Sequence, residues 1–363
     1  MTANRSARLG LLSALGLSLC AVASATGVAH AHAALSRATP AHPAADNSLV
    51  LYSAQGYDST MGKAFGKVSG TQVLLTDDST GNILAKIAAE RNNPHWDVAW
   101  FDGDATMQTL DAQGQLYKWT PAGAGNYTAL GRSLIPADKA FYPTGVTAAG
   151  VIVYNTRRLS AAQAPTDWND LLLPRFRNQV AENDPAFSGP AFPLISGMYL
   201  RMGGGRANAI AKGEAYYRAL KANGLKIFQT NDPTLHSVET GARAIGIVQD
   251  SAYYAAKATG APISVVYPRS GVTVLPGVVA INARSRRLKA AEAFVNYILS
   301  PAGQNVMVHD PNDSDSYYTP IIAGVAALPG RQVNGINYQR LDYIWAGQHA
   351  TEIKTWFHDN IVQ

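Results

Sequence analysis

Carboxylate side chains follow two apolar runs that are typical of buried strands. Asp102 and Asp104 come directly after residues 97–101, and Asp250 comes shortly after residues 244–248. In open α/β sheets, ligands bind beyond the carboxyl ends of the strands. These carboxylates are therefore placed to receive a cation or an ammonium group, although Asp104 equally suits the N-cap of a helix.

Small polar residues precede two helical patterns and have the chemistry to bind an anion. Ser79 and Thr80 come before one of them, and Ser188 and Gly189 come before the other. The first turn of a helix presents unpaired backbone N–H groups and the positive end of the helix dipole. Two such turns facing each other across a cleft would suit a phosphate or phosphonate, whereas each alone is also an ordinary helix cap.

The sequence contains no motif of a nucleophilic hydrolase, a nucleotide-binding enzyme or a zinc peptidase. It lacks a G-x-S-x-G elbow, a P-loop, G-x-G-x-x-G and H-E-x-x-H. The eight histidines are scattered without metal-ligand spacing, and Asp310, Asp313 and Asp315 lack the glycine and the later glutamate of a calcium loop. We therefore expect a protein that is not an enzyme and that carries no cofactor or structural metal.

The elements that would position these residues alternate between strand and helix patterns from residue 48 onwards. Apolar runs predict strands at 49–53, 97–101, 225–228 and 244–248. Spacings of three and four predict helices at 83–88, 105–112, 206–222, from 232, at 290–299 with a restart at 300–301, and at 341–361. This rhythm predicts an α/β fold, and 363 residues with 47% apolar content are enough for two lobes.

Residues 1–31 have the three parts of a secretory signal peptide. Arg5 and Arg8 form a basic start, an apolar stretch of about 15 residues follows, and an A-x-A site ends at Ala31. Alternative A-x-A sites end at Ala25 and Ala33. The apolar stretch is shorter than the roughly 20 residues that a membrane-spanning helix needs. We expect cleavage and a soluble product in the periplasm.

The single cysteine, Cys20, lies inside this segment and follows Leu19, whereas a lipid-attachment signal would have a small residue there. The mature chain would then contain no cysteine, which excludes thiol catalysis and cysteine-based metal sites.

Net charge gives no indication of a nucleic-acid partner. The formal charge is +5, and it falls by two to +3 when Arg5 and Arg8 leave with the signal peptide. The longest basic run is 284–289, which is typical of a solvated helix start. We expect a monomer that does not bind nucleic acid.

Six stretches together resemble the periplasmic solute-binding proteins of ABC importers, and they cover nearly the whole mature chain. They are residues 49–53 with Gln55, 80–87, 96–102, D-W-N-D-L-L-L-P-R at 167–175, 184–189, and A-A-E-A-F-V-N-Y-I-L-S-P-A-G-Q at 290–304. Within that superfamily the chain is similar to the branch that binds ferric iron, thiamine or 2-aminoethylphosphonate, and most similar to the 2-aminoethylphosphonate binders.

The resemblance implies an α/β, two-lobed periplasmic binding protein of type II, with hinge-linked lobes and a ligand cleft between them. Lobe 1 would comprise residues 48–142 and 274–363, and lobe 2 residues 143–273, with 268–277 as a crossover. An inner-membrane ABC permease would be the partner.

The resemblance and the polar residues together imply a zwitterionic ligand. Ser188 and Gly189 stand at the anion-binding turn of the family, and Ser79 and Thr80 would complete the cradle from the other lobe. The ligand's ammonium would pair with Asp102 or Asp250. The short carbon linker would pack on tyrosines, and the residues expected there are Tyr57, Tyr253 or Tyr254. Gln55 is expected beside them in the site. We expect 2-aminoethylphosphonate or a close aminophosphonate.

Three alternatives stay open at this point. Ferric iron would use Tyr253 and Tyr254 with Asp102, although the text of residues 256–260 sets a register that places Asp250 and Ser251 at the iron tyrosines of the family. Thiamine or its phosphate would stack on Trp100 or Tyr253. An exported phosphoester or phosphonate hydrolase would need a nucleophile and a base that the sequence does not offer. Tyr317 and Tyr318 either line the cleft or lie on the surface.

Overall fold

The computed structural model describes residues 47–310 and 317–363. The signal peptide predicted at 1–31 lies outside the described residues, as do Asp313 and Asp315. Within the described ranges, no helix is both long and apolar enough to cross a lipid bilayer.

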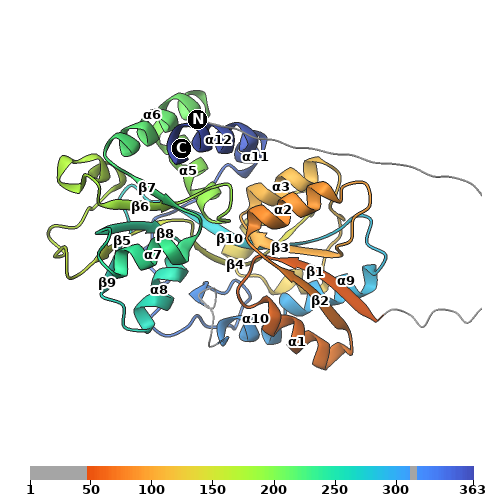
Figure 1. Ribbon diagram of the computed structural model, residues 1–363. Helices are drawn as coiled ribbons and strands as arrows, with labels where there is room; N and C mark the ends of the chain where they lie inside the picture. The colour runs from red at the N-terminus through yellow and green to blue at the C-terminus, as the bar shows by residue number, and fades with distance from the viewer. Residues whose placement is uncertain (1–46, 311–316) are drawn as a thin grey trace, which may run out of the picture. The chain divides into compact units, whose positions relative to one another are not determined.

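The strands form two sheets (Figure 1). The six-stranded sheet has the order β11-β10-β3-β1-β2, with β4 also paired to β10, and the five-stranded sheet has the order β7-β6-β8-β5-β9. The strands of the first sheet are β1 (Ser48–Ser53), β2 (Gln72–Asp77), β3 (Val98–Asp102), β4 (Tyr142–Ala148), β10 (Val272–Ile281) and β11 (Tyr338–Gln339). Those of the second are β5 (Val151–Asn155), β6 (Val180–Asn183), β7 (Lys226–Phe228), β8 (Ile245–Val248) and β9 (Ile263–Val266).

Strand directions decide which residues meet at the sheet edges. In the first sheet β1 runs parallel to β2 and β3, whereas β10 runs antiparallel to β3 and β4. The carboxyl ends of β1 and β3 therefore share one edge, and the register places Asp102 opposite Gly277 of β10. In the second sheet β6 is parallel to β7 and β8, and β5 is antiparallel to β8 and β9.

Within residues 47–310, the chain passes between the strands of the two sheets twice. Strand β4 of the first sheet leads through residues 149–150 into β5 of the second, and β9 leads back through residues 267–271 into β10. The predicted crossover at 268–277 therefore shares its second half with β10, whose residues pair with β3 and β4. The lobe limits at 142 and 143, and at 273 and 274, stay a prediction.

Helices connect the strands in both sheets. They are α1 (Asp58–Ser69), α2 (Thr80–Ala89), α3 (Asp104–Ala112), α4 (Ala129–Ser133), α5 (Ala191–Gly203), α6 (Ala209–Ala222), α7 (Asn231–Glu239), α8 (Asp250–Ala258), α9 (Leu288–Ile298), α10 (Pro301–Val308), α11 (Tyr343–Gln348) and α12 (Ala350–Phe357). Short 3₁₀ turns are η1 (Ala122–Asn126), η2 (Trp168–Leu172), η3 (Pro174–Phe176) and η4 (Arg206–Asn208). A π-turn, η6 (His358–Val362), follows α12.

The elements predicted from hydrophobic spacing are confirmed, with two differences. The helix predicted at 206–222 is instead the turn η4 followed by α6. Helix α2 begins after its predicted cap Ser79 and buries Ile83 and Ile87. The single helix predicted at 341–361 is instead divided into α11, α12 and η6. At the break, His349 leaves helical geometry (φ −101°, ψ 8°). Its ring Nδ1 lies 2.8 Å from the carbonyl oxygen of Trp345.

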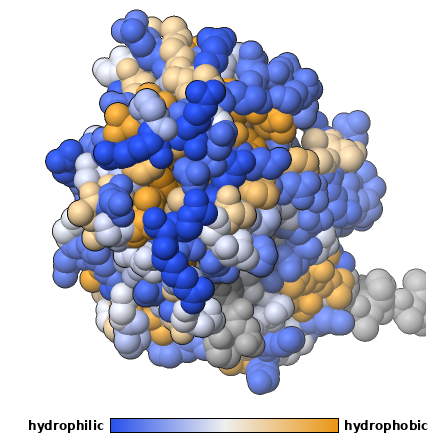
Figure 2. All heavy atoms as spheres, turned by 60° about the vertical axis from the view of Figure 1, so that its left-hand side comes forward, coloured by the Kyte–Doolittle hydropathy of each residue, from blue (hydrophilic) through white to orange (hydrophobic). Residues whose placement is uncertain are grey.

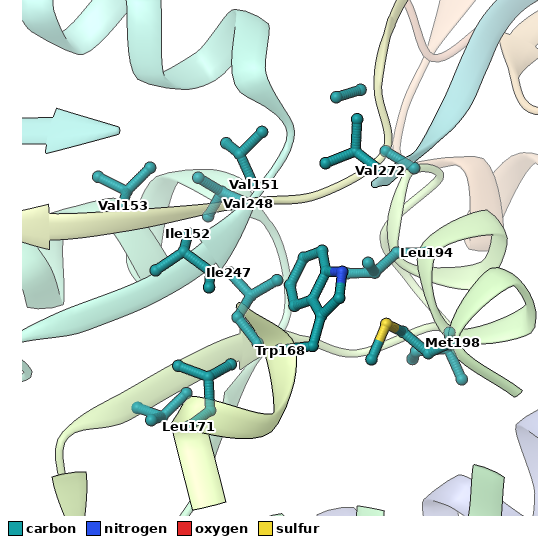
Figure 3. Packing of buried hydrophobic residues seen from close by; sticks show 14 of the residues in the cluster. Val151, Ile152, Val153, Trp168, Leu171, Leu194, Met198, Ile247, Val248 and Val272 are labelled. Carbon is teal, nitrogen blue, oxygen red and sulfur yellow. The ribbon is translucent and has the colours of Figure 1, made fainter. Parts of the chain in front are cut away.

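One large hydrophobic cluster surrounds the second sheet. Figure 3 shows Trp168 near its middle, with Ile247 and Val248 of β8 on one side and Leu194 and Met198 of α5 on the other. The indole Nε1–H of Trp168 donates to the carbonyl of Gly271 at 3.0 Å, so this buried ring also anchors the returning crossover.

The last helices of the chain belong to the same cluster. Trp345, Ile353 and Phe357 are buried in it, and α11 also packs on α3. Trp345 is thus a core residue, and Trp356 packs against the cluster from a partly buried position.

The surface view presents a face that is mostly hydrophilic, with hydrophobic residues in separate groups (Figure 2). The large apolar side chains that are exposed come from different elements: Val68, Leu74, Leu130, Leu173, Val333 and Ile344. Scattered residues of this kind are normal on soluble proteins and do not mark a partner surface.

Candidate functional site

Asp102 ends strand β3 and is almost fully buried, with 5% of its surface exposed. Its Oδ1 accepts hydrogen bonds from Gln55 Nε2 at 2.8 Å and from the Tyr318 hydroxyl at 2.5 Å. Burial raises the pKa of this carboxyl to about 6, and the two hydrogen bonds counteract part of the rise. The strand-end carboxylate predicted from sequence is therefore inside the protein and held by neutral donors.

Gln55 and Tyr57 lie in the loop between β1 and α1. Gln55 is fully buried, and its Oε1 accepts a hydrogen bond of 2.7 Å from the Tyr57 hydroxyl. The Tyr57 ring packs against Trp100 with 5.2 Å between centroids and meets Tyr318 edge-on at 6.5 Å. Because its amide is fixed on one side by Tyr57, Gln55 directs its N–H group at Asp102.

Tyr318 links the two sheets by hydrogen bonds. It lies in the segment that follows α10 of the first sheet, and its hydroxyl accepts a hydrogen bond from Gln249 Nε2 at 2.8 Å. Gln249 is the N-cap residue of α8, directly after β8 of the second sheet. We name Gln55, Tyr57, Asp102, Gln249 and Tyr318 the Asp102 cluster.

Two backbone turns touch beside Asp102. A Cβ at Gly189 would lie 2.6 Å from Thr80 Oγ1 and 3.2 Å from Asp102 Cβ, so only glycine allows this approach without a shift of the neighbours. The N–H of Gly81 donates to the carbonyl of Phe187 at 3.3 Å. The structure thus brings three of the predicted residues together, namely Thr80, Asp102 and Gly189.

The hydroxyls of Ser79 and Ser188 are used within the chain. Ser79 Oγ accepts from the Asn82 N–H at 3.3 Å, which is the ordinary N-cap bond of α2. Ser188 Oγ accepts from Asn183 Nδ2 at 3.2 Å, and Asn183 in turn accepts from the Thr234 hydroxyl at 2.6 Å. Both serines therefore shape the turns around Gly189 and Thr80.

Asp250 has a positively charged partner in the chain. It is fully buried at the start of α8, and its Oδ2 forms a salt bridge of 2.6 Å with Arg331 Nη1, whose side chain is also fully buried. The Tyr267 hydroxyl donates to the same oxygen at 2.8 Å, and the Thr147 hydroxyl and the Ala148 N–H donate to Oδ1 of Asp250. The charge predicted to meet an ammonium of the ligand is balanced by Arg331.

Tyr253 and Tyr254 lie in α8 next to Asp250, and Tyr254 is the one in contact with Arg331. The Arg331 guanidinium lies 4.8 Å from the Tyr254 ring centroid, and the Tyr254 hydroxyl is 3.1 Å from that of Tyr267. Tyr253 packs on Tyr254 with 5.0 Å between centroids, and burial raises its pKa. We name Asp250, Tyr254, Tyr267 and Arg331 the Asp250 cluster.

No group of three or more His, Cys, Asp or Glu side chains that could hold a metal ion occurs in the described part of the chain.

Sequence reasoning missed Gln249 and Arg331, and it left Tyr318 open. Gln249 had a signal, because it directly precedes a strand-end aspartate. Arg331 had none, since it lies 81 positions after Asp250 in a segment without periodicity.

Three comparisons with known proteins agree on the kind of protein that this chain resembles. Residues 88–321 match the family described as bacterial extracellular solute-binding protein. A probable ABC transporter periplasmic-binding protein of Sinorhizobium fredii, y4fP, is 26% identical over 259 residues, which cover 71% of each chain.

Two solved structures have the same fold. The periplasmic binding protein AfuA of Actinobacillus pleuropneumoniae, with fructose-6-phosphate bound, superimposes with a TM-score of 0.77 at 21% identity, covering 86% of this chain and 98% of its own. Iron-bound HitA of Pseudomonas aeruginosa gives 0.74 at 20% identity, with coverage of 86% and 99%. These neighbours are two-lobed type II periplasmic binding proteins, so the predicted fold class is confirmed.

Proposed function

The chain belongs to the bacterial extracellular solute-binding protein family, which serves ABC importers, and we propose that its ligand is a small phosphonate or organic phosphate carrying an ammonium group. The expected ligand is 2-aminoethylphosphonate. The closure of two lobes around the solute, cleavage of the signal peptide after Ala31, a monomeric state and delivery to an inner-membrane permease are parts of the same proposal.

The main support for this proposal is that Asp102 has no positively charged partner among the described residues. In the described ranges, its hydrogen bonds come from the neutral groups of Gln55 and Tyr318, and it forms no salt bridge. Asp250, in contrast, is paired with Arg331. A buried carboxylate without a cation is unfavourable, and a ligand ammonium would supply the missing charge.

The anionic end of the ligand has a place close to the same carboxylate. Thr80 at the start of α2 and Gly189 just before α5 both lie against Asp102. Helix starts favour anions such as phosphate through their free N–H groups. Because the anion and cation subsites adjoin, the carbon linker between the two charged groups must be short, as in 2-aminoethylphosphonate.

Ligand entry requires the two turns to separate. The backbone N–H of Gly81 is bonded to the carbonyl of Phe187, and Gly189 lies against Thr80. These two contacts between the turns support a mechanism in which the lobes open to admit the solute and close again with the turns around it.

Ferric iron is the second candidate, because HitA has the same fold and carries iron. Arg331 weighs against an iron site built on the tyrosine pair. Its guanidinium lies 2.6 Å from Asp250 and 4.8 Å from the Tyr254 ring centroid, so a positive charge already occupies the surroundings of these oxygens. A trivalent cation would be repelled there.

Isothermal titration of the unfolded, ligand-stripped and refolded mature protein tests the proposal. We expect 2-aminoethylphosphonate to bind at micromolar concentration or tighter. Asp102→Asn should weaken it roughly 10- to 100-fold, which corresponds to the about 1.5–3 kcal/mol of one charge-assisted hydrogen bond. The exposed Asp232→Asn serves as the matched control and should bind like the wild type.

The same experiment separates the alternatives. Binding of fructose-6-phosphate that is insensitive to Asp102→Asn would keep the anion subsite and reject the ammonium. A coloured complex with ferric citrate, without heat from 2-aminoethylphosphonate, would replace the proposal with iron transport. Heat from thiamine alone would indicate an aromatic site instead.

A further inference from the structure

A pocket of about 220 Å³ lies between α2 and α3 on one side and α5 and α12 on the other. Figure 1 shows these four helices near one another. Most of the surface that lines the pocket is apolar and comes from residues such as Leu84, Ile87, Leu110 and Phe192, whereas threonine and glutamine side chains of α3, α12 and the residues after α3 complete the wall around Lys354. Neither the Asp102 cluster nor the Asp250 cluster contributes a residue to it.

Lys354 of α12 is the charged residue of this pocket. Its Nζ lies 4.8 Å from the centroid of the Phe192 ring, which is also part of the wall. In the described part of the chain, this ammonium has neither a hydrogen-bond acceptor nor an ion-pair partner. Burial lowers its pKa to about 8, and the more distant negative charge of Asp184 acts in the opposite direction.

An ammonium in apolar surroundings is unfavourable unless an anion or an acceptor joins it. The contact with an aromatic ring compensates only part of the loss of water, since a cation–π contact contributes about 0.5–2 kcal/mol. A ligand that suits this pocket would therefore supply an acceptor for the Lys354 ammonium and fill the apolar space beside it.

We propose that this pocket is a second ligand site, for a small organic carboxylate with an apolar body. The carboxylate pairs with Lys354, and the apolar body packs on Leu84, Ile87 and Phe192. An apolar cavity of roughly 150 Å³ accepts a benzene molecule, so about 220 Å³ accommodates a ring together with a carboxylate. Benzoate is the matching probe, and hexanoate is its aliphatic counterpart.

The site adjoins the solute site through the helices that they share. Helix α2 begins at Thr80 and contributes Leu84 and Ile87 to the pocket, and α5 begins two residues after Gly189 and contributes Phe192. The two helices whose starts touch beside Asp102 are therefore also walls of this pocket. A carboxylate bound there holds them together.

Titration calorimetry with benzoate tests the second site. We expect one benzoate per wild-type molecule, at least tenfold weaker binding of the neutral isostere benzyl alcohol, and at least tenfold weaker benzoate binding by Lys354→Met. Lys212→Met, an exposed lysine of α6, is the matched control and should bind like the wild type. Asp102→Asn should also bind benzoate normally, so that failure here is distinguishable from failure of the proposed function.

A second variant covers the case in which Lys354→Met does not fold. Ala88 is exposed at the pocket, and Ala88→Trp should fill the space and abolish benzoate binding. The proposal is overturned if wild-type protein shows no saturable binding of benzoate or hexanoate, or if Ala88→Trp and Lys354→Met both bind benzoate as tightly as wild type.

Discussion

The charge state of Asp102 makes solute binding dependent on pH. Burial raises the pKa of this carboxyl from 3.8 to about 6, so it is mostly neutral at pH 5 and ionised at pH 7.5. A ligand ammonium pairs with the ionised form only. Affinity for 2-aminoethylphosphonate should therefore rise with pH through about 6, and the ligand should lower the pKa of Asp102 when it binds.

The size of the effect follows from the fraction of Asp102 that is ionised. With a pKa of about 6, that fraction is about one in eleven at pH 5 and close to one at pH 7.5, so the dissociation constant should fall about tenfold between them. The phosphonate titrates in a similar range, near pH 6 for a phosphate-type group, and contributes its own pH dependence. Asp102→Asn isolates that part, because the amide does not titrate.

Calorimetry in two buffers of different ionisation heat measures the protons released. At pH 5 the wild type should release about one more proton per ligand bound than Asp102→Asn does. The reasoning is refuted if both proteins release the same number of protons, or if the wild-type affinity falls relative to the variant as pH rises.

Three further predictions concern Arg331, Gly189 and Glu182, a fully buried carboxyl of β6 that accepts a hydrogen bond from the Tyr217 hydroxyl. Arg331→Met leaves Asp250 as an unpaired buried charge and should lower the free energy of unfolding by about 3–5 kcal/mol, measured by urea denaturation. Gly189→Ala places a Cβ 2.6 Å from Thr80 Oγ1 and should weaken ligand binding by about 1–3 kcal/mol, measured by calorimetry. Burial raises the pKa of Glu182 from 4.5 to about 8, so the wild type should lose on the order of 3 kcal/mol of stability between pH 4.5 and 7. Glu182→Gln should remove that loss in denaturation measurements across this range.

Each of these measurements has a control variant or a result that would contradict the prediction. Arg286→Met changes an exposed arginine, and Gly125→Ala adds a Cβ with nothing within 4 Å, so both should behave like the wild type. Equal stability of Arg331→Met and Arg286→Met would mean that the buried pair contributes nothing net. A wild-type unfolding free energy that is flat from pH 4.5 to 7 would show that Glu182 titrates normally.

The strand-to-helix arrangement was predictable because it rests on local patterns. The spacing of Ile83 and Ile87 in α2, and the apolar run that ends at Asp102, are periodic signals that burial enforces. The division of the last helix at His349 was not predictable, since a change of direction there depends on how α11 and α12 pack on α3 and α5.

In the candidate site, too, the residues placed by local patterns were predictable and those placed by tertiary contacts were not. Thr80, Asp102 and Gly189 could be named from sequence, because strand ends and helix starts of an α/β fold converge by topology. Asp250 could also be named, but not its partner. Arg331 reaches it from a segment without regular pattern, and only tertiary contacts show that the carboxylate is already neutralised.

The C-terminal helices are the last part of the chain to be synthesised, although they belong to the core around the second sheet. Trp345, Ile353 and Phe357 complete the hydrophobic cluster around the second sheet, yet they are translated after every strand of that sheet. Until they emerge from the ribosome, the aromatic and aliphatic side chains of α5 and α6 lack part of their cover. The core around the second sheet is therefore complete only when the last residues of the chain have been made.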